Sequence, residues 1–507
     1  QKKPAIYKAS TKEIEKSSIL NQKDFTRAKE TIKFIKDKKW NSALKSASKV
    51  KDVEFRNLIN WMYLKTTRNG ASFSEYKNFI EQNSEYPRIN RIRFLAEGKI
   101  YLRNNSPISI INWFDKYPPL GGMGKIKLAE AYLEKGQTDE VQKLIKEGWE
   151  TATISKNDLG YYRAKFKKFI DPEDHIKRAD YLAWEKKYWD LKRMLKYLPK
   201  DQRALYNARQ ILMSNSYGVD NAISKVPEYL KKDPGLEFDR LRWRNRRGRL
   251  EGSLEILYRN SIKTEQQMVR PDKWWEQRES VVRSLIYKKR YKTAYKISSE
   301  HALSAGPSFA EAEWLSGWIA LTFLNSPEYA INHFQNFYNN VGYPISLARG
   351  AYWLGASYEK LNEKQLSNDF YSQAAEFPMT YYGQLAFNKI NPGGNFELKD
   401  ESFFDRDYEK EFKKNKLIRH IILLKELNAT QLGKDIFKHL AGLNIEKGSE
   451  VLAAELATNV ERYDFAIQIS KKASYEKRFY NQFNYPIIAT PKIINNKVMP
   501  KSEVVLA

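Results

Sequence analysis

The 507-residue chain contains no cysteine. That absence excludes a disulfide framework, a thiolate metal site and a cysteine nucleophile. Long hydrophobic runs are also missing, because no stretch approaches the ~18 consecutive apolar residues of a membrane-spanning helix. Glycine and proline are scarce, at 23 and 18 residues, whereas tyrosine and tryptophan are abundant, at 32 and 12. This composition is typical of a helical scaffold and not of a disordered chain.

Acidic residues are too few to balance the basic ones. The chain has 61 Asp and Glu against 88 Lys and Arg, which gives a net charge of +27. Such a charge attracts anionic partners. Nucleic acid, an anionic membrane surface and a cell-wall polymer with carboxylate-bearing peptides are candidates. A lysine-rich composition that only covers solvated helix faces explains the charge equally well.

Signals for metals, cofactors and common nucleophiles are lacking too. No Gly-x-Ser-x-Gly motif marks a nucleophile. Glu311 and Glu313 are two residues apart and would point away from each other on a helix, so they are not a ready acid/base pair. No two histidines stand three or four residues apart, which argues against a helical metal site. We therefore predict neither metal nor cofactor. The histidines are His175, His301, His333, His420 and His439.

What the sequence does contain is clearest in residues 311–387, which are predicted to form two helical hairpins in tandem. Gly317 in the first hairpin and Gly355 in the second resemble the small residue of the tetratricopeptide pattern, which lets two helices approach. Bulky residues at helical spacing surround them, and we interpret them as core. These are Leu315, Ile319, Phe323, Ala330, Phe334 and Phe337, then Ala351, Leu354, Tyr358, Leu361, Phe370, Ala374 and Phe377.

Helical spacing with brief links also marks most of the remaining chain. This succession predicts an all-α fold, a solenoid of helical hairpins in which each repeat packs on its neighbours.

Longer segments carry a more specific signal. The chain reads PDKWWEQR at 271–278, AEWLSGW at 312–318, YWLG at 352–355 and FPMTYYGQLA at 377–386. In this order the segments resemble soluble lytic murein transglycosylases of Gram-negative bacteria. In that family a ring-like, right-handed superhelix of helices precedes a small lysozyme-like catalytic domain. The resemblance implies a superhelical domain over 1–387, a smaller helical linker domain over 388–499, and the first residues of the catalytic domain at 500–507.

The resemblance also implies a chemistry. Family members cleave the β-1,4 bond between N-acetylmuramic acid and N-acetylglucosamine and leave a 1,6-anhydro product, with one carboxyl as general acid and then base. The family's catalytic Glu would follow the segment PKSEVVLA at 500–507. The implied expectation is that none of these residues is catalytic and that the fragment is inactive alone. Glu503 lies too early for that role, and Glu279 lies in the scaffold segment despite the Ser that follows it.

The densest basic patch is a second candidate for function. On a helix, its arginines would form two adjacent faces around one tryptophan. Three interpretations stay open: a structural network between helices, a contact with an anionic glycan or peptide, and nucleic-acid binding, for which no known module is present. The patch consists of Arg240, Arg242, Trp243, Arg244, Arg246, Arg247 and Arg249.

Tyr381, Tyr382, Gly383 and Gln384 are candidates for seating the catalytic domain, although packing within the last hairpin explains them as well. The resemblance further implies periplasmic location, removal of a signal sequence before Gln1, and peptidoglycan glycan strands as the partner, with no nucleic acid. The alternatives are a periplasmic tetratricopeptide-like scaffold that binds protein without catalysis, and a basic solenoid for nucleic acid.

Overall fold

A computed structural model describes residues 14–214, 217–261, 264–395, 402 and 406–486, and the backbone of 493–494 and 497–498. The chain forms two compact units. Unit 1 combines Gln1–Lys99 with Leu398–Ala507, and unit 2 is Ile100–Glu397.

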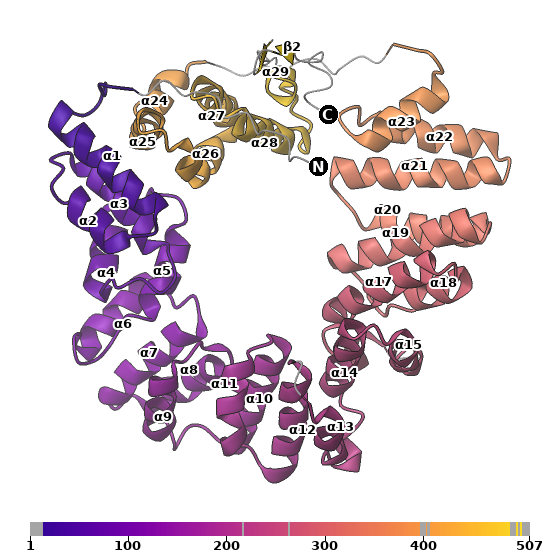
Figure 1. The fold of residues 1–507 in the computed structure, drawn as a ribbon, viewed down its shortest axis with the longest axis horizontal. Helices are drawn as coiled ribbons and strands as arrows, with labels where there is room; N and C mark the ends of the chain where they lie inside the picture. Colours follow the sequence, from indigo (N-terminus) through magenta and orange to yellow (C-terminus); the bar gives the residue numbers. More distant parts are fainter. Residues whose placement is uncertain are drawn as a thin grey trace. The chain divides into compact units, whose positions relative to one another are not determined.

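Unit 2 is a succession of helices, most of which pack on the helix before or after them in the chain. Helices α7 and α8, α19 and α20, and α21 and α22 lie side by side as hairpins (Figure 1). The helices are α6 (Pro107–Lys116), α7 (Gly122–Glu134), α8 (Thr138–Thr151), α9 (Lys156–Lys165), α10 (Pro172–Trp184), α11 (Tyr188–Met194), α12 (Lys200–Leu212), α13 (Val219–Ser224), α14 (Pro234–Arg246), α15 (Leu250–Arg259), α16 (Glu265–Met268), α17 (Pro271–Tyr287), α18 (Tyr291–Ser299), α19 (Gly306–Phe323), α20 (Pro327–Asn339), α21 (Pro344–Lys360), α22 (Lys364–Ala375) and α23 (Tyr381–Ile390), with 3-10 turns at Leu195–Tyr197 and Glu228–Leu230.

Unit 1 is built from both ends of the chain. Its elements are α1 (Gln22–Lys36), α2 (Trp40–Ala47), α3 (Val53–Leu64), α4 (Phe73–Gln82) and α5 (Ile89–Glu97), then α24 (Glu409–Lys413), α25 (Lys416–Glu426), α26 (Lys434–Ala441), α27 (Ser449–Asn459), α28 (Tyr463–Ser474) and α29 (Asn481–Asn484), with 3-10 turns at Thr430–Gly433 and Ile445–Lys447. Strands β1 (Ile493–Ile494) and β2 (Lys497–Val498) pair antiparallel.

Polar contacts join the two sequence segments of unit 1. Arg419 on α25 donates to both carboxylate oxygens of Asp52, at 3.0 and 2.6 Å. Asp52 also caps α3 by accepting the Phe55 N–H at 2.7 Å. The Tyr86 hydroxyl and His420 Nε2 are 2.6 Å apart, and the His420 side chain is fully buried. The first helices and the helices after residue 406 therefore share one interior.

The same turn recurs where two helices form a hairpin. One residue adopts a left-handed conformation, with φ between 56° at Lys186 and 73° at Gly136, and the next residue is the N-cap of the following helix. That next residue donates its N–H to the carbonyl five residues earlier, as in Lys187 to Leu182 at 2.9 Å, which is a Schellman-type helix end. The left-handed residues are Lys38, Gly136, Lys186, Gly248, Lys289, Asn362 and Glu461.

The core of unit 2 follows the predicted hairpin pattern. A Cβ atom at Gly317 would lie 2.8 Å from the Phe334 ring, and one at Gly355 would lie 2.8 Å from the Tyr371 ring. Leu315, Phe334, Leu354 and Ala374 are fully buried. Both glycines thus permit close helix contact, as the tetratricopeptide-like spacing predicts.

The predicted all-α solenoid is confirmed. Helix α23 continues to Ile390, past the boundary expected at residue 387, and the extents of the two predicted domains remain predictions. Residues 500–507, Glu503 among them, lie outside the described residues. Within the described part, no helix is long and apolar enough to cross a bilayer.

Candidate functional site

The predicted arginine patch lies in one hairpin of unit 2. Asp233 caps α14 by accepting the Leu236 N–H at 2.8 Å, and Pro234 follows at the first helical position. Arg240, Arg242, Arg244 and Arg246 are on α14, and Arg247 and Arg249 flank Gly248 in the turn to α15. Four of the six arginines therefore share one helix, whereas Arg247 and Arg249, expected on the same two helical faces, lie beyond its end because Gly248 turns the chain.

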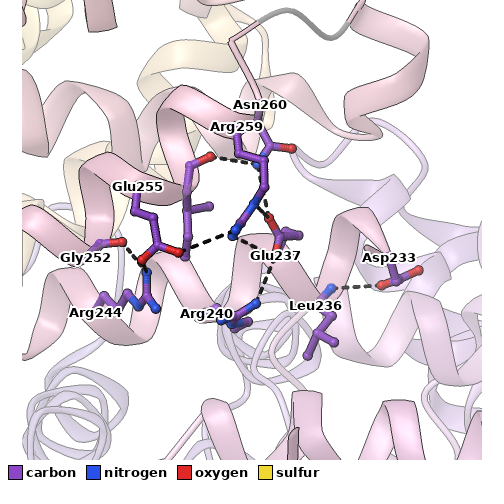
Figure 2. Close-up of polar contacts among 10 residues, drawn as sticks. Asp233, Leu236, Glu237, Arg240, Arg244, Gly252, Glu255, Arg259 and Asn260 are labelled. Atoms are coloured by element: carbon purple, nitrogen blue, oxygen red, sulfur yellow. Dashed lines mark hydrogen bonds and ion pairs between the residues drawn. The ribbon is translucent and has the colours of Figure 1, made fainter. Parts of the chain in front are cut away.

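Glu237 anchors one side of this hairpin (Figure 2). Its carboxylate is buried and accepts from Arg240 Nη1 at 3.0 Å and from Arg259 Nε at 3.1 Å. Asn260 Nδ2 donates to the same carboxylate at 3.3 Å. A buried carboxylate is stable only when it is paired and hydrogen-bonded in this way, so Arg240 is part of an internal network.

Two further arginines also have backbone partners. Arg244 donates to the Gly252 carbonyl and lies 3.0 Å from Glu255 (Figure 2). The hydrogen bond between Arg244 and Glu255 holds the pKa of Glu255 below its usual range. Arg246 donates to the carbonyls of Leu212 at 2.5 Å and Met213 at 3.0 Å. These carbonyls are at the end of α12, where a cation is favoured by the helix dipole.

Arg242 belongs to a buried chain of charges that links α10, α12 and α14. It lies 2.9 Å from Asp239, and Asp239 lies 2.9 Å from Arg209. Arg209 is completely buried and also contacts Asp180 at 2.6 Å. Its guanidinium stacks over Trp184, 5.2 Å from the ring centroid. Helical spacing does not reveal Arg209, because its partners are about thirty positions away along the chain.

Two arginines of the patch lie over the ring of the half-buried Trp243. Arg247 and Arg249 are exposed and lie 5.3 and 4.8 Å from its ring centroid. The intrachain network, one of the three interpretations, accounts for Arg240, Arg242, Arg244 and Arg246. Binding of an anionic ligand by the patch stays a prediction. Arg246, Arg247 and Arg249 are its exposed members, and Trp243 is partly buried against the core.

The Tyr381–Gln384 segment opens α23. Thr380 caps the helix by accepting the Gly383 N–H at 3.0 Å, and Gln384 donates to the Pro378 carbonyl at 3.0 Å. The Tyr382 ring packs against that of Tyr352, at 5.3 Å. Tyr381 is different, because 69% of it is exposed. Packing within the last hairpin thus occupies three of the four candidates, and a domain contact through them stays a prediction.

A buried titratable cluster was not identified from the sequence. Glu313 on α19 lies 2.9 Å from His301 Nε2 and 2.8 Å from His333 Nδ1. His301 Nδ1 accepts the Leu303 N–H, so its Nε2 carries the proton that is donated to Glu313. His333 Nε2 contacts the Tyr295 hydroxyl at 3.0 Å. The histidines are 12 and 20 residues from Glu313, beyond the reach of helical spacing.

The cluster keeps Glu313 ionised. Burial alone would raise the pKa of Glu313, but hydrogen bonds from His301 and His333 outweigh it and lower the pKa to about 2. A general acid requires the opposite shift. Within the described ranges, no group of three or more His, Cys, Asp or Glu residues is placed to hold a metal ion.

No protein-family model and no curated protein sequence matches the chain. Solved structures do match it. For the 70-kDa soluble lytic transglycosylase Slt70 from Escherichia coli, the TM-score is 0.55 at 13% identity, over 92% of this chain and 72% of that one. For a complex of the 70-kDa soluble lytic transglycosylase with bulgecin A, the values are 0.54, 12%, 92% and 72%. For an inactive mutant of the lytic transglycosylase Slt from Pseudomonas aeruginosa, they are 0.58, 16%, 87% and 69%.

The chain therefore has the helical fold of these transglycosylases over most of its length. The fold expected from the resemblance in sequence segments is confirmed by structures that share few identical residues with it.

Proposed function

We propose that this chain is the helical scaffold of a peptidoglycan lytic transglycosylase that acts in the periplasm of a Gram-negative bacterium. The observation that carries the proposal is the fold shared, over 87–92% of the chain, with structures named as lytic transglycosylases. The sequence supports it independently, because several segments between residues 271 and 386 resemble those of the family and occur in the same order.

The scaffold's task in this proposal is to hold a glycan strand before cleavage. Its net charge of +27 attracts a polymer that carries carboxylate-bearing peptides. The whole protein would cleave the β-1,4 bond between N-acetylmuramic acid and N-acetylglucosamine and leave a 1,6-anhydro end.

The general acid of that reaction is proposed to lie outside the described residues. Such an acid needs a raised pKa in a partly apolar site. The pKa of Glu313 is lowered, and Glu237 is ion-paired. Burial raises the pKa of Asp233, but its carboxylate is committed to the α14 cap. We infer that the fragment binds substrate without cleaving it, and that exposed Tyr381 seats the protein's own catalytic domain.

Binding is tested by retention of purified residues 1–507 on peptidoglycan sacculi and on immobilised duplex DNA, at low and high salt. Stronger retention on sacculi than on DNA at both salt concentrations supports the proposal. Equal retention on both, lost together as salt rises, would indicate non-specific charge and overturn it.

Cleavage is tested by incubating the same protein with sacculi and analysing the soluble fraction by chromatography and mass spectrometry. We expect no 1,6-anhydromuropeptides above the level of a buffer control. Their release would overturn the inference that catalysis needs a further domain. Absence of sacculus binding, together with capture of a specific protein, would favour the alternative of a protein-binding scaffold without catalysis.

A further inference from the structure

A cavity of about 400 Å³ lies in unit 1 between α26 and α28. Its size falls within the range of roughly 300–1,000 Å³ that is usual for small-molecule sites. Phe437, Phe465 and Ile469 line it and are themselves buried. The two aromatic rings are 5.2 Å apart. The floor of the cavity is therefore apolar and supported by the core of the hairpins.

Each helix presents one stripe to the cavity. On α26 the stripe is Lys434, Phe437, Lys438 and Ala441, and on α28 it is Phe465, Gln468, Ile469 and Lys472. The spacing of three and four residues places each set on one helical face. Apolar residues at such positions normally pack against a neighbouring helix, so the lysines within these stripes require another explanation.

The lysines of the cavity have few internal counterions. Lys434, Lys438 and Lys472 are exposed, and their side chains form no hydrogen bond or ion pair with another described residue. Only Lys472 acts on a carboxylate of the lining, because it contributes, after Arg478, to lowering the pKa of Glu476. The remaining charges of the lining are Arg478, Glu450 and Glu476, so the four cationic and two anionic side chains leave the cavity with a net positive charge. Arg478 donates to Glu450 at 2.6 Å and to Glu476 at 2.7 Å, and Tyr480 completes the Glu450 site at 3.0 Å. The rim is thus cationic, and its positive charge is available to a ligand.

We propose that this cavity binds the carboxylate-bearing peptide of peptidoglycan and not its glycan. The rim ammonium groups pair with the peptide carboxylates, while the apolar floor takes short alkyl side chains. A neutral sugar would leave the lysines without counterions. A nucleotide base needs an accessible ring for stacking, and Phe437 and Phe465 are only 0% and 5% exposed. The identity of the peptide rests on the proposed function, whereas the ligand chemistry rests on the cavity.

The probe is a fluorescently labelled, N-blocked tetrapeptide of Ala, γ-linked Glu, diaminopimelate and Ala, titrated with full-length 1–507 and followed by anisotropy. A matched peptide with its carboxylates amidated keeps the shape and loses the charge. An uncharged oligosaccharide of N-acetylglucosamine forms the third ligand and represents the glycan without peptide. We expect binding of the acidic peptide, at least about tenfold weaker binding of the amidated one, and a decline with salt.

The variant Lys438→Glu/Lys472→Glu reverses two rim charges without breaking a described hydrogen bond or ion pair of either side chain. Its control, Lys410→Glu/Lys471→Glu, changes the net charge of unit 1 equally, at exposed lysines that do not line the cavity. Circular dichroism verifies that both fold. We expect the first variant to weaken peptide binding at least about tenfold and the control to leave it within about twofold. A Gly442→Phe variant tests occlusion, because a Cβ there meets only carbonyl oxygens at 3.7 Å.

The outcomes separate this proposal from the function on which it rests. Sacculus binding without peptide binding, or peptide binding that both double variants weaken equally, overturns the cavity proposal and leaves the scaffold function standing. Peptide binding sensitive only to the rim variant, without sacculus binding, supports the cavity and overturns the scaffold function. Binding of peptide-free glycan that the rim variant abolishes would reassign the cavity to sugar and overturn the inference.

Discussion

Replacement of Gly235 by alanine should destabilise unit 2 even though it adds a better helix former. Glycine-to-alanine changes inside helices usually stabilise by about 0.5–1 kcal/mol. At Gly235, however, the new Cβ would lie 2.3 Å from the Arg209 guanidinium. That group is at the end of a flexible side chain, but its contacts with Asp239 and Asp180 and its stacking on Trp184 hold it in place.

The magnitude follows from the ion pairs that must break. Loss of a buried charge partner costs about 3–5 kcal/mol, so the intrinsic gain of alanine leaves a net destabilisation of about 2–4 kcal/mol. The effect is local, because repeats in a solenoid contact mainly their neighbours. Hydrogen exchange followed by mass spectrometry should therefore show faster exchange in α12 and α14 of Gly235→Ala.

Gly160 provides the matched control. It lies within α9, and a Cβ there meets nothing within 4 Å, so Gly160→Ala should slow exchange locally. In an Arg209→Met background the clash disappears, and Gly235→Ala should then become neutral or stabilising. Protection of α14 in Gly235→Ala equal to or above that of the parent protein would refute the claim that Arg209 is held in place.

Three further predictions concern charge. Glu313→Gln should remove about 3 kcal/mol of stability at neutral pH, because the pKa of Glu313 falls from 4.5 to about 2 on folding. When the parent protein is acidified, it should lose this contribution between about pH 5 and pH 2. Burial lowers the pKa of His420 to about 3, so acidification from pH 7 to pH 5 should destabilise unit 1 by about 2 kcal/mol, and a His420→Phe variant should lack this pH dependence. Arg247→Ala/Arg249→Ala should reduce sacculus retention at low salt several-fold more than Lys292→Ala does.

The signs of these pH effects make them refutable. A carboxylate with a lowered pKa stabilises above its unfolded value and loses that contribution as the pH falls, so Glu313→Gln should flatten the acid limb of the unfolding curve. A histidine with a lowered pKa stabilises above about pH 6.5 and loses that contribution below it. An acid limb unchanged in Glu313→Gln, or equal pH dependence in His420→Phe and the parent, would contradict the assigned partners.

Local patterns explain what could be predicted from the sequence. The glycine and aromatic spacing around Gly317 and Gly355 is set within one hairpin, and the observed contacts with Phe334 and Tyr371 follow from it. The arginines of α14 were recognisable as a patch because residues three and four apart share a helical face. The family-like segments between residues 271 and 386, which follow one another in the family's order, predicted the helical fold.

Partnerships between helices could not be predicted in this way. Glu237 is satisfied by Arg259 from the following helix, and Glu313 by histidines on a loop and on α20. Nothing in the spacing of one helix specifies which neighbour it will face. The lysines on the cavity faces of α26 and α28 illustrate a usable signal, since charged residues at positions expected to pack indicate that the face is open to a ligand.

The left-handed residue of the recurrent hairpin turn affects how easily each helical hairpin unfolds under mechanical force. Glycine accepts the left-handed conformation freely, as at Gly136 and Gly248, whereas Lys186 and Lys289 hold it at a cost of about 1 kcal/mol each. Hairpins closed by lysine are thus expected to be less stable than hairpins closed by glycine, and to unfold first when the chain is pulled. Lys186→Gly or Lys289→Gly should stabilise one turn at a time, so that the resistance of each hairpin to unfolding can be changed separately.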